Sequence, residues 1–279
     1  MIVNFERFFK ELGKLNNKLK SYEKFIEKSR VEDSYKRARM LSEIENLIKN
    51  PIVYDTLKAS PLFVELEKFL TQEKEKITHD QEELHFNIGI KLSNLLSEFG
   101  ELKGQLPNLR IKYYTLKFNF NEGTVGFWWG PEKELIKKLP LNLDTIVKTV
   151  KEFDRDLQSR WHSYKEFCEV LKTAYRRYLV LNNLSWGDKV NLLELLREIV
   201  MLVQKKNFWI NPTKNNFREY SRVTYSYDLY QLKTTQELIN EFQLTVATFA
   251  LTDSKATAIW VPDNESGNGT YYSTIAFQK

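Results

Sequence analysis

The 279-residue chain has a single cysteine, three histidines and no long apolar segment. A lone thiol excludes an internal disulfide, so the core alone must hold the fold. No stretch reaches the roughly 20 consecutive apolar residues that a membrane-spanning helix requires. The amino terminus begins with charged and aromatic residues where a secretory signal would be apolar. We therefore expect a soluble, cytoplasmic protein with no membrane partner.

Sequence motifs for catalysis are also missing. The chain has no GxxxxGK[S/T] segment for phosphates, and no two histidines share one helix face at the i, i+4 spacing. Cys168 lies on an apolar helical seam, which is typical of a buried structural thiol. One cluster of acids and imidazoles would be spread around a helix in solvent: His79, Asp80, Glu82, Glu83 and His85. We expect no metal, no cofactor and no catalytic residue, and an enzyme such as a nuclease is the least favoured class.

Apolar and aromatic residues are plentiful. They make up 42% and 14% of the chain, which excludes a disordered or collagen-like protein and predicts a substantial core. The length corresponds to one large domain or two small ones. Lysine and arginine exceed aspartate and glutamate by 42 to 37, so the net charge is +5.

Residues 1–107 carry two heptad patterns, which predict an antiparallel coiled-coil hairpin. The first helix is expected to run from residue 5 to about 49, although the phase slips after Ile26. The second is expected between residues 61 and 107. An ordinary two-helix layer packed on the rest of the protein is the alternative. The seams are Phe5, Phe8, Leu12, Leu15, Leu19, Tyr22 and Ile26 in the first helix, and Leu84, Ile88, Leu92, Leu95, Phe99, Leu102 and Leu106 in the second.

Residues 108–279 form the second expected domain, a mixed α+β body. Alternation over 109–120, a turn at 121–123 and the returning segment TVGFWW predict a β-hairpin. Helices are expected over 132–139, over 144–182 and from Ser185 or Asp188 to residue 206.

The carboxyl-terminal part of this body is expected to end in a three-stranded antiparallel meander. Its strands are predicted over 244–251, 256–261 and 271–277, after a short helix capped by Thr234 to Glu237. The whole fold is then helix-rich α+β. The order of elements also suggests a winged-helix-like arrangement of the carboxyl portion.

Basic residues are concentrated between residues 205 and 222. Five cations against Glu219 alone give +4 (5 minus 1) in this segment, and aromatic residues are interleaved with them. This combination can neutralise phosphates while rings stack on bases. The candidate nucleic-acid-binding residues are Lys205, Lys206, Lys214, Arg218, Arg222, Trp209 and the pair Arg176 and Arg177. A second basic run, free of acids from Leu102 to Asn121, contains Lys103, Arg110, Lys112 and Lys117.

Two classes of function follow from these patterns. In the first, the chain is a non-enzymatic accessory or assembly subunit that contacts DNA or RNA and assembles, as a homo-oligomer or with a protein partner, through its coiled-coil arm. In the second, it is a structural or protein-interaction subunit without nucleic acid, and the basic surface meets an acidic protein or solvent. Basic residues at helix ends also simply favour the helix dipole.

Overall fold

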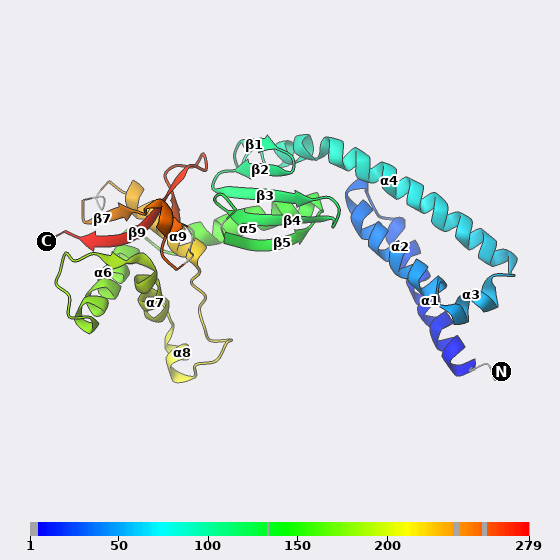
Figure 1. Cartoon of the computed structure of the whole chain (residues 1–279), viewed down its shortest axis with the longest axis horizontal. Helices are drawn as coiled ribbons and strands as arrows, with labels where there is room; N and C mark the ends of the chain where they lie inside the picture. Colours follow the sequence, from blue (N-terminus) through cyan, green and yellow to red (C-terminus); the bar gives the residue numbers. More distant parts are fainter. Residues whose placement is uncertain (1–4, 133, 237–239, 253–255, 279) are drawn as a thin grey trace. The chain divides into compact units, whose positions relative to one another are not determined.

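The structure is a computed structural model that describes residues 5–132, 134–236, 240–252 and 256–278 (Figure 1). It is rich in helix and contains two antiparallel sheets. The expected helix-rich α+β class, with helices at the amino terminus, is therefore confirmed. No helix within the described ranges is both long and apolar enough to cross a membrane.

The chain divides into two compact units. The first comprises Met1–Glu98, Phe118–Val125 and Leu139–Val147, and the second comprises Phe99–Lys117, Gly126–Lys138 and Lys148–Lys279. Both units take segments from the region that follows residue 108. The division expected between residues 107 and 108 remains a prediction.

The first unit is mainly helical. Its helices are α1 (Phe5–Ile26), the 3-10 helix η1 (Val31–Asp33), α2 (Ser34–Ile48), α3 (Pro51–Leu57) and α4 (Pro61–Leu95). α1 and α2 lie side by side, and α2 also packs on α4 (Figure 1). These helices share one core, which includes Leu15, Tyr22, Leu41, Ile44, Leu70 and Ile77.

The chain reverses after Ile26, so the prediction of one continuous helix to residue 49 was wrong. The Ser29 hydroxyl donates to the Ile26 carbonyl at 3.0 Å, and the Asp33 carboxylate accepts from the Arg30 backbone amide at 3.1 Å. The two heptad phases therefore belong to separate helices, α1 and α2. The phase slip in the sequence marked a turn between them.

The second helix of the predicted hairpin ends earlier than expected. α4 stops at Leu95, and the residues expected to extend it form strand β1 (Leu102–Gln105). Gly104 has a φ of +96°, and a Cβ there would lie 2.7 Å from the Asn108 carbonyl oxygen. The tight turn into the next strand therefore requires glycine at this position. A helix could not contain a residue with this φ.

A five-stranded antiparallel sheet follows α4. Its strands lie in sequence order: β1, β2 (Asn108–Ile111), β3 (Tyr114–Asn119), β4 (Thr124–Trp129) and β5 (Glu134–Pro140). The predicted hairpin is present as β3 and β4, but the strand predicted over 109–120 is two strands, because Lys112 has a positive φ and the chain turns there between β2 and β3. The helix predicted over residues 132–139 was wrong, because Gly130 and Glu132 both have positive φ and turn the chain into β5.

The long helix predicted over 144–182 is two helices, α5 (Leu143–Gln158) and α6 (Tyr164–Leu181). α5 covers one face of the sheet, where Phe153 packs edge-on against Tyr114 and Phe127. Trp161 lies in the break between the helices, and its indole N–H donates to Asp228 at 2.9 Å. The heptad pattern therefore assigned Trp161 to a helical seam that the chain does not form.

The remaining elements are β6 (Val190–Asn191), α7 (Leu192–Leu202), α8 (Lys206–Ile210), α9 (Arg222–Thr234), β7 (Phe242–Val246), α10 (Phe249–Thr252), β8 (Ile259–Pro262) and β9 (Gly269–Phe277). β9 pairs with β7, β6 and β8, so the last strand is central to the second sheet. In a meander the middle strand β8 would be central. Thr234 ends α9 rather than capping a new helix, and Glu237 of the expected capping box lies outside the described residues.

Candidate nucleic-acid interface

The segment between α7 and α9, residues 203–221, forms a closed loop that contains α8 and projects from α7 (Figure 1). Gln204 joins the two ends of this loop and is 8% exposed. Its side-chain amide donates to the carbonyls of Val200 at 2.6 Å and Arg218 at 3.0 Å, and its side-chain oxygen accepts from the Arg218 amide at 2.8 Å. We call residues 205–218 the basic aromatic loop.

Internal contacts give the basic aromatic loop a defined shape. The Asn216 side chain donates to the Asn211 carbonyl at 2.8 Å, and the Phe217 amide donates to the Thr213 carbonyl at 3.2 Å. The Phe208 ring lies 5.8 Å from the Phe217 ring, measured between centroids. Side chains on the loop are therefore presented by a preformed scaffold rather than by a freely moving chain.

Large apolar side chains on this loop are open to solvent. The exposed fractions are 57% for Trp209, 71% for Ile210 and 41% for Phe217. The Trp209 ring is held edge-on against Phe208, with 5.6 Å between centroids. A cluster of exposed apolar side chains on an ordered loop is typical of a contact surface for a partner.

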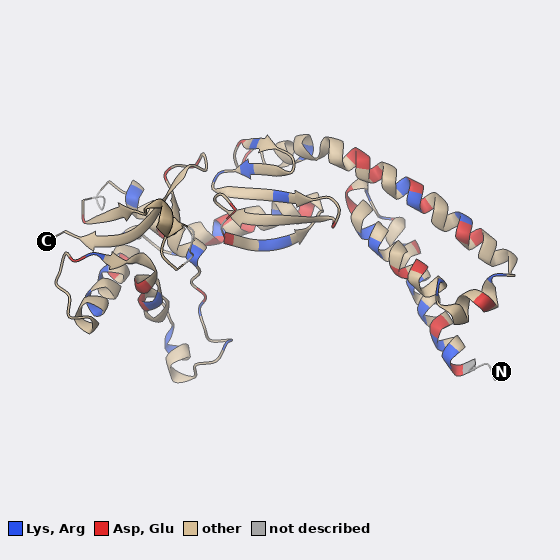
Figure 2. Cartoon of the chain, in the orientation of Figure 1, with Lys and Arg blue, Asp and Glu red and all other residues tan. Residues whose placement is uncertain are grey.

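Four cations lie on the same loop, three of them exposed and one half-buried: Lys205, Lys206, Lys214 and Arg218. Within the described part of the chain, none of their side chains forms an ion pair. Figure 2 shows Lys but no Asp or Glu along α8. The loop therefore joins cations that pair with no described acid to rings that can stack, a combination that suits single-stranded nucleic acid.

The structure groups Lys205, Lys206, Trp209, Lys214 and Arg218 on this one loop. Arg222 lies apart in α9, where its guanidinium contacts Glu134 at 2.6 Å and donates to the Ala258 carbonyl at 2.9 Å. Arg222 therefore ties α9 to β5.

The other predicted cations lie on α6. The Arg176 guanidinium stacks over Trp186 at 5.4 Å, and Arg177 pairs with Glu198 of α7 at 3.0 Å. Among the described residues, a carboxylate therefore neutralises Arg177 but not Arg176. Their assignment to a nucleic-acid surface stays a prediction.

A buried carboxylate anchors the carboxyl-terminal base of the loop. Asp228 is fully buried in α9 and accepts from the Tyr220 hydroxyl at 2.7 Å and from the Trp161 indole at 2.9 Å. Burial raises the pKa of Asp228 to about 6, although these two hydrogen bonds and the nearby Arg160 and Arg218 work against the shift. Its second oxygen, Oδ1, accepts no hydrogen bond from the part of the chain that the structure describes.

Sequence reasoning missed both anchoring residues. Gln204 and Asp228 bind residues that come close to them only when the chain folds. No sequence motif therefore marks their positions. Asp228 does leave one signal, because it is the sole charge within the aromatic segment VTYSYDLY. An acid in such a segment is expected to be buried with hydrogen-bond donors.

Of the acids and imidazoles considered for metal binding, Asp80 does not lie in solvent as expected, because it is 13% exposed and pairs with Arg37. No group of three or more histidine, cysteine or acidic side chains in the described ranges could hold a metal ion. Cys168 is fully buried, as predicted. Burial, together with the nearby Glu241, raises the pKa of its thiol to about 11, so the reactive thiolate is disfavoured.

Comparison of the chain with protein family models, with curated proteins and with solved structures found no match in any of the three. The winged-helix-like arrangement expected for the carboxyl portion therefore stays a prediction.

Proposed function

We propose that this chain is a cytoplasmic, non-enzymatic subunit that binds nucleic acid through the basic aromatic loop. One observation carries the proposal: cations that have no acidic partner among the described residues share one loop with exposed rings. Phosphate contacts by the cations supply affinity that does not depend on sequence, and the rings add stacking on bases.

The alternative of an acidic protein partner is less well supported by the same residues. A protein partner of this kind would be held mainly by charge. Trp209 and Ile210 nevertheless expose most of their surface beside the cations, and a polar, acidic surface would leave them in water. A nucleic acid offers such a loop both a negatively charged phosphate backbone and the flat apolar faces of its bases.

The test is a fluorescence anisotropy titration of labelled single-stranded and duplex DNA and RNA at 50 and 200 mM salt. Binding that weakens steeply with salt supports the proposal, because each phosphate contact releases counterions. The loop variant carries four substitutions to alanine: Lys205→Ala, Lys206→Ala, Lys214→Ala and Arg218→Ala. A charge-matched control removes four exposed lysines of α1 instead: Lys10→Ala, Lys14→Ala, Lys20→Ala and Lys24→Ala.

Both variants lower the net charge from +5 to +1, because each removes four positive charges. The proposal expects the loop variant to lose binding and the control variant to keep it. Equal losses in the two variants would show a nonspecific charge effect. Absence of binding by the unmodified chain at 50 mM salt would overturn the proposal.

A second candidate function is self-association through α4. Phe86 and Ile90 are 85% and 63% exposed and lie one turn apart on this helix. A Cβ on Gly89, between them, would meet nothing within 4 Å, so a second helix has room to approach. The expected outcome is a dimer by light scattering that Phe86→Ser with Ile90→Ser converts to a monomer. A monomeric unmodified chain would contradict this function.

A further inference from the structure

The five-stranded sheet has a polar face on the side opposite α5. Along β2, β3 and β4 the apolar side chains alternate toward α5, so the positions between them share the opposite face. We call this the open face. Its described positions on β1 to β4 include no acid: Lys103, Gln105, Asn108, Arg110, Thr115, Lys117, Asn119, Thr124, Gly126 and Trp128. All except the buried Thr115 are exposed or half-buried.

Trp128 lies on the open face with the Nε1 edge of its indole toward Gly126, which leaves room for it. A Cβ on Gly126 would lie 2.4 Å from the indole Nε1 of Trp128 and 3.2 Å from its Cδ1. Any side chain at residue 126 would therefore displace the ring. A half-buried indole held by its edge on the face of a sheet leaves part of its ring face open to a partner, and unpaired bases stack on such rings.

Two cations on neighbouring strands lie directly opposite each other on this face. Lys103 of β1 is paired in register with Arg110 of β2. Like charges directly opposite each other destabilise a sheet unless an anion lies between them. Among the described residues, the Arg110 guanidinium has no ion-pair partner.

The remaining cations of the open face are held only by exposed pairs. Lys103 contacts Glu101 at 3.0 Å, and Lys117 contacts Glu132 at 2.7 Å. The two lysine side chains are 51% and 50% exposed. Exposed pairs of this kind contribute little, so phosphates can replace the glutamates at small cost.

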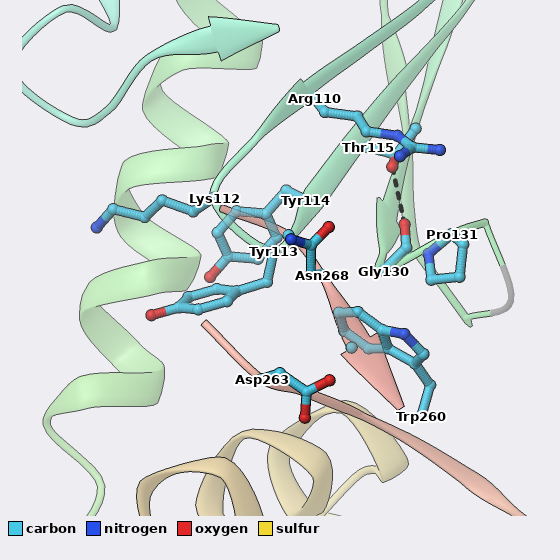
Figure 3. A pocket seen from close by; sticks show the side chains of 12 residues that line it. Arg110, Lys112, Tyr113, Tyr114, Thr115, Gly130, Pro131, Trp260, Asp263 and Asn268 are labelled. Carbon is cyan, nitrogen blue, oxygen red and sulfur yellow. Dashed lines mark hydrogen bonds between the residues drawn. The ribbon is translucent and has the colours of Figure 1, made fainter. Parts of the chain in front are cut away.

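The hairpin of β8 and β9 borders the open face beside Arg110. Arg110, Thr115, Trp260 and Asn268 line a cavity of about 290 Å³ there. Figure 3 shows Arg110 and Thr115 at one end of this cavity and Asp263 at the other. Asp263 accepts from Lys233 at 2.6 Å and Thr270 at 2.7 Å, so this acid is already neutralised. Lys112, which also lines the cavity, pairs with Asp154 at 3.5 Å, so Arg110 is the lining charge that has no ion-pair partner among the described residues.

We infer that the open face is a second nucleic-acid contact that selects single strands, with Trp128 stacking on an unpaired base and Arg110 holding a phosphate. Strands in a sheet are about 4.8 Å apart, and only β3 separates β2 from β4, so the two contacts lie about 10 Å apart across the sheet. A duplex hides its base faces and cannot use Trp128. The inference rests on the proposed function and names its substrate class.

The test compares a labelled single-stranded oligonucleotide with a duplex of the same sequence, bound to the full chain. Trp128→Ala is expected to weaken single-strand binding by roughly 5- to 150-fold and to leave duplex binding unchanged. Arg110→Ala is expected to lower the salt slope for the single strand by about 0.7. Phe249→Ala, which removes an 85% exposed ring from α10, is the matched control and should change neither.

Gly126→Ala keeps the indole but displaces it, so it tests the ring's placement even if Trp128→Ala impairs folding. It is expected to weaken single-strand binding while circular dichroism and the melting temperature remain close to those of the unmodified chain. Single-strand binding unchanged in a folded Gly126→Ala or Trp128→Ala variant would overturn the inference, as would tighter binding of the duplex.

Failure of the inference can be told apart from failure of the proposed function. If the four-substitution loop variant loses affinity while the Trp128 and Gly126 variants keep it, only the open-face contact is wrong. If the unmodified chain binds neither single strand nor duplex at 50 mM salt, both proposals fail together.

Discussion

Lysine and arginine side chains have different surroundings in the helical bundle of the first unit and in the basic aromatic loop of the second. In the bundle, cations on one helix pair with acids on another, as in Arg37 with Asp80, Lys18 with Glu43 and Lys74 with Glu45. In the loop, four cations have no carboxylate partner among the described residues. The bundle also has a core of buried apolar side chains, although Phe86 and Ile90 of α4 are exposed, and the loop exposes Trp209 and Ile210.

This contrast shows that pairing, rather than the number of basic residues, separates a structural charge from a candidate binding charge. Sequence composition cannot make that distinction, because it records neither the partner nor its distance. Arg222 illustrates the point: it belongs to the same basic segment as Lys205, yet it is held by Glu134.

The largest effect is expected on binding when the loop charges are removed. Four phosphate contacts predict a slope near −3 for log K against log[salt] on a single strand. The loop variant should reduce the magnitude of this slope by about 3 and weaken binding by about a thousandfold at 50 mM salt. Its unfolding in urea should match that of the unmodified chain, and a large loss of stability would show that these cations are structural.

The opposite pattern is expected for Arg37 in the bundle. Its side chain is 4% exposed and pairs with Asp80, which is 13% exposed. Arg37→Ala leaves a buried charge without its partner and should lower the free energy of unfolding by about 3 kcal/mol or more. Arg37→Met combined with Asp80→Leu should recover most of that loss. Urea unfolding measures both, and weaker nucleic-acid binding by the folded variants would break the contrast between bundle and loop.

Asp228 should make stability depend on pH. Its folded pKa of about 6 lies above the usual value near 4, so the folded state retains a proton that the unfolded state releases. This residue therefore contributes its full stabilisation below about pH 4, and that contribution is lost as the pH rises through 6. The loss is about 3 kcal/mol.

Asp228→Asn removes this titration but keeps an oxygen that can accept from Tyr220 and Trp161. Compared with the unmodified chain, the variant should gain relative stability between pH 4 and pH 7. Urea unfolding at several pH values measures the difference. Parallel curves for the two proteins would contradict the burial of a titrating carboxylate at the base of the loop.

A smaller effect is expected from opening the base of the basic aromatic loop. Gln204→Ala removes three hydrogen bonds and leaves backbone groups of Val200 and Arg218 without them, which should cost about 1–3 kcal/mol. Limited proteolysis should then cleave within residues 205–217 more rapidly. Gln243→Ala, at an exposed position of β7, is the control. Unchanged cleavage would show that the loop is ordered without Gln204.

Local patterns in the sequence identified a large part of the fold. The heptad repeat located α1 and α4, and the alternation on either side of Gly123 located the β3–β4 hairpin. The same rules failed where two consecutive helices continue one seven-residue repeat, because the repeat does not show the break between them. Trp161 fits a seven-residue repeat, but its indole binds Asp228 and ends the helical run.

The sequence identified the charged residues of the candidate site but not the contacts that shape its loop. The basic residues of the loop and Trp209 were found from composition, whereas Gln204 and Asp228 depend on contacts that only the folded chain makes. The open face was signalled by the acid-free basic run that contains Arg110. The position of Trp128 above Gly126 could not be read in advance, because it depends on the pleat of β4.

Ultraviolet cross-linking of the full chain to a single-stranded oligonucleotide, followed by mass spectrometry of the peptides, tests the central claim most directly. The account predicts cross-links within residues 205–218, at Trp209 or Phe217, and their loss in the loop variant. Cross-links confined to the helical bundle, or none at saturating oligonucleotide, would contradict it.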